Sequence, residues 1–220
     1  MITLSLRTWL KLGLMAAGLL GTAACSADAP ATASQPASTA QTATENAGTA
    51  SDAPPRARIE TSLGNIEIEF LPKQAPATTA HILKLIDDGF YEGLIFHRVV
   101  AGFVVQTGGY TREMARRDYP ETVVNESANG LSNLKGTLAM ARLAHPDSAD
   151  SQWFINVRNN RRLDGARNKP GYTVFARVTG GWETVTAIEL TNTVLRKNAD
   201  GIPLPGVPET PIEILKIVRL

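Results

Sequence analysis

The fold of this chain is decided by the stretch Phe96–Gly109, which reads FHRVVAGFVVQTGG. It places one arginine, Arg98, among the β-branched residues that are typical of a strand. A guanidinium stays charged at any working pH and carries five N–H donors, so in an apolar wall it needs acceptors. Those acceptors come either from the protein, as in a structural ion-pair network, or from a ligand. The stretch by itself leaves both interpretations open.

The composition is that of an ordinary globular protein. The 220 residues are 43% hydrophobic and carry 22 basic against 21 acidic side chains, a net charge of +1. Basic residues run no longer than pairs, whereas a nucleic-acid-binding surface needs a basic patch, so nucleic acid is not an expected partner. His81, His97 and His145 have no metal-ligand spacing. We therefore expect no metal site and no cofactor.

Residues 1–24 have the layout of a secretory signal peptide. Arg7 and Lys11 precede the apolar block Leu12–Leu20, and small residues follow that block. The block is shorter than the roughly 20 residues that a membrane-spanning helix needs. This length favours a cleaved export signal over an anchor helix.

Cys25 is the only cysteine and directly follows the small residues. This placement resembles a bacterial lipoprotein signal, in which the thiol is lipidated and becomes the new N-terminus. Thr22 departs from that pattern, which usually has leucine there, and the alternative is ordinary cleavage near Ala24 that leaves a soluble protein. We expect lipidation at Cys25 and a periplasmic location in a bacterial cell envelope. Because Ser26 is not Asp, the outer membrane is favoured.

Residues 25–55 are expected to be a disordered linker. The segment Ser26–Pro55 contains no aromatic residue and no Val, Ile or Leu, so it cannot bury enough apolar surface to order itself. Residues 56–220 have a size that forms one domain around a single core. We expect that domain to be a monomer.

The pattern over residues 56–220 predicts a mainly β fold. Alternating apolar residues on both sides of Gly64-Asn65 indicate a hairpin with its turn there. Helices are expected from Pro76 to a stop at Gly89 and over Trp182–Leu190. No strand–helix alternation runs through the chain, which favours a closed eight-stranded antiparallel β-barrel capped by the two helices. The other six strands are expected at Ile95–Val100, Phe103–Thr107, Gly136–Arg142, Gln152–Val157, Tyr172–Thr179 and Ile212–Val218.

Six sequence blocks stand in the order in which cyclophilins have them. The blocks are Phe96–Val99, Gly102-Phe103, Gln106–Gly109, Gly136–Ala141, Ser151–Ile155 and Leu163–Gly165. From roughly Ile59 to Leu220 the chain therefore resembles the cyclophilin family. The resemblance implies the barrel described above and peptidyl-prolyl cis–trans isomerase activity on proline-containing polypeptides.

The resemblance also implies a set of site residues. Arg98, Gln106 and Phe103 are the expected catalytic residues: the guanidinium faces the prolyl nitrogen, the amide holds a peptide carbonyl and the ring lies in the proline slot. His97 is grouped with the substrate-binding residues, although on a strand it points to the face opposite Arg98 and so has a supporting role. The remaining substrate-binding residues are Val104, Ala141, Arg142, Leu143, Gln152, Phe154, Leu163 and Tyr172.

Three positions depart from the family pattern. Arg142 stands where many cyclophilins have Asn, and Tyr172 stands where the best-known eukaryotic members have His. Arg162 stands where those members have a Trp that contacts cyclosporin, so we expect weak cyclosporin binding. The alternative function is a binding module, a chaperone or scaffold that holds proline-containing segments without essential turnover.

Overall fold

The computed structural model describes residues 53–166 and 168–220, which belong to the unit Gly48–Leu220. The predicted signal peptide, Cys25 and the linker up to residue 52 lie outside the described residues. Within the described residues, no helix has both the length and the apolar character that crossing a membrane requires.

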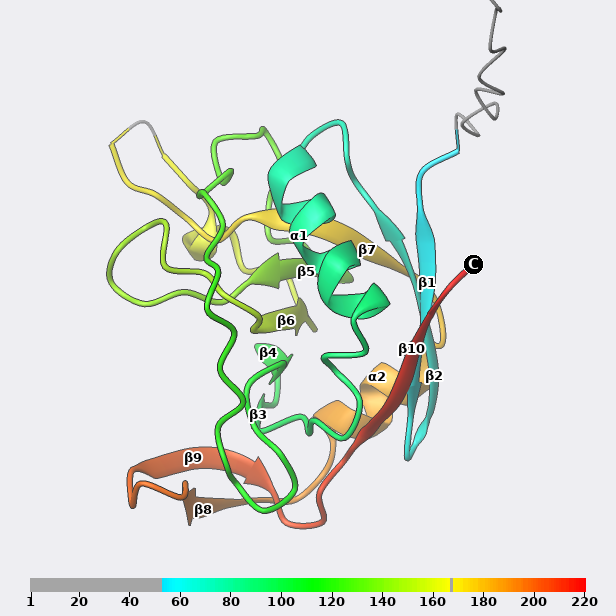
Figure 1. Ribbon diagram of the computed structural model, residues 1–220, viewed down its shortest axis with the longest axis vertical. Coiled ribbons are helices and arrows are strands. Elements are labelled where there is room, and N and C mark those ends of the chain that lie inside the picture. The colour runs from blue at the N-terminus through cyan, green and yellow to red at the C-terminus, as the bar shows by residue number, and fades with distance from the viewer. Residues whose placement is uncertain (1–52, 167) are drawn as a thin grey trace, which may run out of the picture. The chain divides into compact units, whose positions relative to one another are not determined.

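Eight strands form one antiparallel sheet, and they are the eight strands that the sequence pattern predicts (Figure 1). Most are shorter than expected, because only part of each predicted range pairs with a neighbouring strand. In spatial order the sheet runs β10-β1-β2-β7-β5-β6-β4-β3. The strands are β1 (Arg56–Thr61), β2 (Gly64–Phe70), β3 (Arg98–Val100), β4 (Val104–Thr107), β5 (Thr137–Met140), β6 (Trp153–Asn156), β7 (Val174–Gly180) and β10 (Ile214–Arg219).

The predicted closure of the barrel is not confirmed. Among the described residues, no strand ladder joins the edge strands β3 and β10; the sheet is strongly curled, and its rims meet at the isolated bridge between Ile95 and Glu213. At that bridge the Phe96 N–H donates to the Ile212 carbonyl at 2.9 Å. One reason is that β9 (Pro203–Pro208) lies against β3 instead. A Cβ on Gly206 would lie 2.7 Å from the Val99 carbonyl oxygen, so a glycine is needed for this approach.

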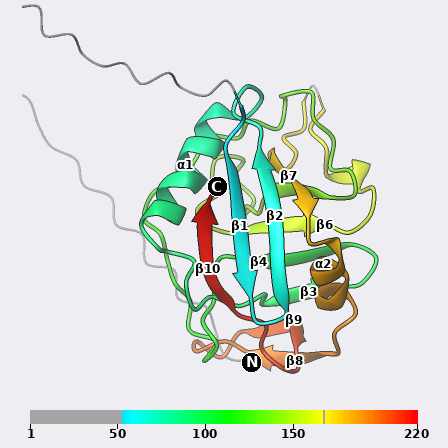
Figure 2. The same ribbon diagram turned by 90° about the vertical axis from the view of Figure 1, so that its right-hand side faces the viewer.

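The core lies on the concave face of the curled sheet, and two helices help to cover it. In α1 (Pro76–Asp87) the residues Ile82, Leu85 and Ile86 are buried at three-to-four spacing. In α2 (Trp182–Glu189) the buried apolar residues are Val185 and Ile188. Figure 2 shows β10, β1 and β2 side by side, with α1 and α2 on opposite sides of these strands. The two helices predicted from the sequence are therefore confirmed.

The sequence-based prediction contains two local errors, a misplaced turn and a hairpin that it omits. The first hairpin turns at Ser62-Leu63 rather than at Gly64-Asn65, because Gly64 already pairs with Thr61. The Thr61 hydroxyl stabilises this turn by donating to the Gly64 carbonyl at 2.7 Å and accepting from the Leu63 N–H at 3.1 Å.

The other error is a hairpin that the sequence pattern did not reveal, formed by β8 (Thr193–Lys197) and β9. Prolines in β9 argue against a strand, since they cannot donate ladder hydrogen bonds. They are tolerated here because this sheet has two strands, so each strand has a free edge.

Candidate active site

One row of directly paired residues crosses five strands of the sheet. It runs Arg98–Gln106–Phe154–Ala139–Val174, each residue facing the next across the ladder. The neighbouring row, which includes Val105, Ile155 and Leu138, is fully buried in the main core. Because side chains alternate between the two faces of a strand, the Arg98 row lies on the face away from that core. This placement explains how one strand carries both a core valine and an arginine.

A hollow of about 240 Å³ lies over this row. Its floor is apolar: Val104 and Phe154 are buried in a second hydrophobic cluster, against which Leu163 and Tyr172 pack. All nine lining residues are among the predicted site residues, and we call this hollow the slot. The lining residues are Arg98, Phe103, Val104, Gln106, Ala141, Arg142, Phe154, Leu163 and Tyr172.

Phe103 reaches the slot from a turn rather than from a strand. Gly102 adopts a φ of 64°, and the Phe103 N–H closes the turn on the Val100 carbonyl at 2.9 Å. From α2, the Glu189 carboxylate accepts from the Gly102 N–H at 2.9 Å. Phe103 thus leaves strict strand alternation, as its position after a glycine predicts.

A network of buried asparagines supports this side of the slot, and the sequence pattern did not identify it. The Asn160 Nδ2 donates to the Phe103 carbonyl at 2.9 Å and to the Asn156 Oδ1 at 2.8 Å. The Asn160 backbone in turn donates to the Asn133 carbonyl at 2.7 Å. The single turn of 3₁₀ helix η1 (Arg161–Leu163) follows Asn160 and carries Leu163 to the slot. In the sequence these asparagines are indistinguishable from ordinary turn residues.

The polar side of the slot is a chain of three side chains. Arg98 Nη1 donates to Gln106 Oε1 at 3.4 Å, and Gln106 Nε2 donates to Gln152 Oε1 at 3.1 Å. Arg98 is half-buried rather than fully buried, and within the described residues it forms no ion pair. Burial lowers the pKa of its guanidinium, and the nearby Tyr172 opposes that shift. An arginine with this single long hydrogen bond has donors left for a ligand.

Gln152 and Leu143 do not line the slot but an adjoining hollow of about 120 Å³. Leu143 is 71% exposed at its rim. Arg142 lies between the two hollows, and its guanidinium donates to the carbonyls of Gly171, Pro170 and Leu143 at 2.7–2.9 Å. The two loops that border the slot are therefore tied together by one side chain. The sequence pattern did not single out three residues that line the adjoining hollow, Arg116, Ser148 and Asp150.

His97 lines neither hollow. Its ring is buried and lies 4.8 Å from that of Tyr110, centroid to centroid. Burial lowers the pKa of its imidazole from 6.5 to about 4, so it is neutral at ordinary pH. Within the part of the chain that the structure describes, no group of three or more His, Cys, Asp or Glu side chains could hold a metal ion.

The sequence and the fold both match those of known proteins. A family model for cyclophilin type peptidyl-prolyl cis-trans isomerases matches residues 56–217. The chain belongs to this family. A peptidyl-prolyl cis-trans isomerase of Acinetobacter baylyi is 40% identical over 159 residues, which cover 72% of this chain and 82% of that protein. The peptidyl-prolyl cis-trans isomerase A of Dickeya dadantii is 41% identical over 163 residues, covering 73% and 83%.

A solved structure shares the cyclophilin fold. It is a cyclophilin type isomerase of Cryptosporidium parvum, crystallised in the presence of the dipeptide Ala-Pro. Its TM-score is 0.57 at 25% identity, and the match covers 74% of this cyclophilin and 97% of that chain.

Proposed function

We propose that this peptidyl-prolyl cis–trans isomerase works by stabilising the twisted amide of an X–Pro bond, with Arg98 as the electrostatic catalyst. The observation that carries the proposal is the half-buried Arg98 guanidinium, without an ion pair among the described residues, at the edge of an apolar slot. Rotation about the bond requires no nucleophile and no metal. It requires a group that binds the twisted amide more strongly than the planar one.

The electronic change in the substrate explains why a guanidinium suits this task. Amide resonance opposes rotation with a barrier of about 18–20 kcal/mol. At the twisted geometry the prolyl nitrogen regains a lone pair that the planar amide does not offer. A charge-assisted hydrogen bond from Arg98 to that lone pair forms in the transition state and is absent in both ground states. It therefore lowers the barrier in both directions.

The other slot residues hold the peptide while it rotates. The proline ring packs against the apolar side chains of Phe103, Phe154 and Leu163. Gln106 is fixed from both sides by Arg98 and Gln152, which keeps its amide in place for a substrate carbonyl. The backbone of Ala141–Leu143 pairs with the substrate chain, a short β-augmentation that reads main chain rather than side chains. The Cryptosporidium parvum relative, studied with Ala-Pro, supports a small proline-containing ligand.

Exchange spectroscopy on a short X–Pro peptide tests the proposal and distinguishes it from a binding module without turnover. We expect Arg98→Ala to lower kcat/KM about 10²- to 10³-fold, the usual cost of losing one transition-state donor. Arg58→Gln, which removes an arginine from β1, is the matched control and should keep the wild-type rate. If wild type and Arg98→Ala are equally slow while peptide binding persists, the binding module is the correct interpretation.

We further propose that this cyclophilin acts on polypeptides of a bacterial cell envelope, held in the periplasm by a lipid on Cys25 after cleavage of residues 1–24. The sequence pattern of residues 1–55 supports this location, with the outer membrane favoured. The mass of the mature N-terminus tests it. Acylation of Cys25 adds several hundred daltons and Cys25→Ser abolishes the addition, whereas an unmodified mature chain would contradict the anchor.

A further inference from the structure

Guanidinium groups lie on two aromatic rings of the slot. The Arg142 guanidinium carbon lies 4.9 Å from the centroid of the Tyr172 ring, and that of Arg162 lies 4.5 Å from the centroid of the Phe103 ring. Arg98 and Arg142 thus line the hollow of about 240 Å³, and Arg162 lies next to it on the ring of Phe103. Cation–π contact orients a guanidinium but does not cancel its charge.

No carboxylate among the described residues neutralises these three arginines. The slot is lined by Arg98 and Arg142 and by no acidic side chain, and Arg162 forms no ion pair within the described residues. Asp150, in the adjoining hollow, is paired with Arg116 at 3.2 Å. Asp164 and Glu189 keep their charge, because they accept from the neutral backbone N–H groups of Asn133 and Gly102, but neither lines the slot nor forms an ion pair with these arginines.

The hydrogen bonds of Arg142 also leave its charge in place. Its acceptors are carbonyl oxygens, which are neutral dipoles. The Arg162 side chain is exposed, and within the described residues its contact is the face of Phe103. A charged group that arrives at the slot in a ligand would therefore meet positive charge that the protein has left uncompensated.

We propose that this site selects proline-containing segments with Asp or Glu next to the proline. The proposal rests on the function proposed above and names its substrate class. The two arginines lie on different walls of the slot, Arg142 on the Tyr172 ring beside the segment Ala141–Leu143 and Arg162 on the Phe103 ring. We infer that a peptide whose residues before the proline pair with Ala141–Leu143 passes Arg142 before the proline and Arg162 after it.

The size of the preference follows from the exposure of these groups. Ion pairs at exposed positions are weak, and their range corresponds to roughly 1.4- to fivefold in an equilibrium or rate ratio. We expect kcat/KM for a peptide with Glu beside proline to exceed that of the matched Gln peptide by about this factor. Because the effect is electrostatic and partly solvated, raising the salt concentration should abolish it.

The test uses matched peptides with Glu, Gln or Lys before the proline, and a second set with these residues after it. Exchange spectroscopy gives kcat/KM for each at about 0.02 M and about 0.5 M salt, where screening is weak and strong respectively. The expected order at low salt is Glu above Gln above Lys, converging at high salt. Equal values for Glu and Gln at low salt would overturn the selectivity. The isomerase function is tested separately, by whether the protein accelerates cis–trans exchange of the Gln peptide.

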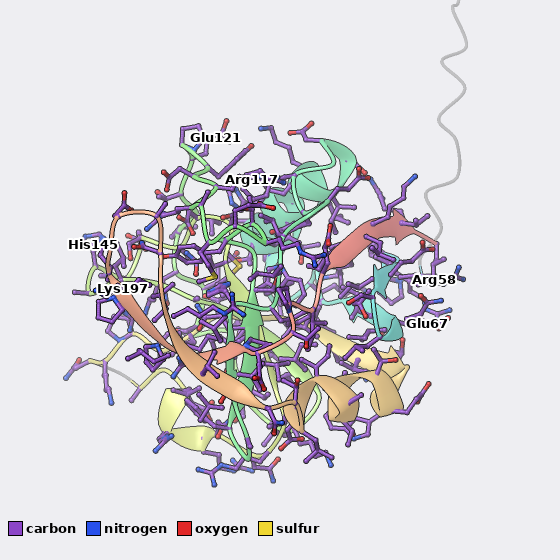
Figure 3. All side chains as sticks on the ribbon, turned by 90° about the horizontal axis from the view of Figure 1, so that it is seen from below. Arg58, Glu67, Arg117, Glu121, His145 and Lys197 are labelled. Atoms are coloured by element: carbon purple, nitrogen blue, oxygen red, sulfur yellow. The ribbon has the colours of Figure 1, made fainter. Side chains whose placement is uncertain are left out.

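Variants assign the effect to individual arginines. Arg162→Gln should remove the preference for Glu after the proline and keep the preference for Glu before it, while Arg142→Lys should keep the latter because the charge remains. Ratios between peptides cancel any general loss of activity in a variant. Arg58→Gln is the control: Figure 3 shows Arg58 on the side of the molecule away from His145, whose loop borders the slot, so its ratios should equal wild type. A preference that Arg162→Gln leaves unchanged would refute the assignment of Arg162.

Discussion

Replacing Asn160 with alanine should both destabilise the protein and weaken catalysis, although Asn160 does not line the slot. The residue is 2% exposed, and its side chain donates to the Phe103 carbonyl at 2.9 Å and to Asn156 Oδ1 at 2.8 Å and accepts from Arg158 Nε at 3.2 Å. Truncation leaves the buried Asn156 Oδ1 without its donor, whereas the Phe103 carbonyl keeps the Val157 N–H at 3.1 Å. A buried polar group that loses its partner costs about 1–3 kcal/mol.

The one unpaired acceptor predicts a decrease of about 1–3 kcal/mol in the free energy of unfolding. For a domain of this size that corresponds to a fall in Tm of roughly 5 °C. Phe103 and η1 would lose their shared support, so the slot would widen. We expect kcat/KM on an X–Pro peptide to fall about tenfold at a temperature where the variant is still folded.

Urea unfolding followed by fluorescence, together with exchange spectroscopy, measures both effects. Asn159→Ala is the matched control, because Asn159 is the exposed neighbour and accepts a single hydrogen bond, from the Lys135 N–H at 3.0 Å. Its unfolding free energy should stay within about 0.5 kcal/mol of wild type. If Asn160→Ala unfolds at the same urea concentration as Asn159→Ala and keeps full kcat/KM, the asparagine network does not support the slot.

Three further predictions follow from single residues. The unfolded protein binds a proton at His97 near pH 6.5 and the native protein only near pH 4, so the free energy of unfolding decreases as pH falls through that window, by about 2 kcal/mol between pH 8 and pH 5. Urea titrations at several pH values should show a smaller decrease for His97→Phe than for the wild type. An equal dependence of the unfolding free energy on pH in both proteins would contradict this. Arg162→Trp should raise the cyclosporin affinity above that of the wild type, measured by calorimetry, and equal affinities would contradict the effect expected of Arg162. Gly171→Ala should destabilise by about 1–3 kcal/mol, since its Cβ would lie 2.2 Å from the Gly165 nitrogen, and an unchanged Tm would show that the loop adapts.

The sequence pattern predicted the secondary structure well where one face of a strand is buried. Alternation located β1 and β2, because Ile59, Ile66 and Ile68 must all reach the core. It failed for β8, whose side chains are largely exposed and so show no buried period, and for β9, whose prolines and glycine are atypical of a strand. The predicted closure of the barrel is not confirmed, because closure depends on which edge strands meet, and that is not a property of either strand alone.

The sequence by itself determined the residue types of the site, because the order of its blocks carries the resemblance to cyclophilins and the chemistry of an arginine needs acceptors. Phe154 lies far along the chain from Arg98 and Gln106, and only the register of β3, β4 and β6 sets the three in one row. Likewise, only the folded loops show that Arg142 and Arg162 lie on the rings of Tyr172 and Phe103. Local side-chain preferences act over a few residues, whereas strand register and loop contacts are fixed by packing of the whole domain. The tertiary structure therefore decided how the arginines are placed around the slot.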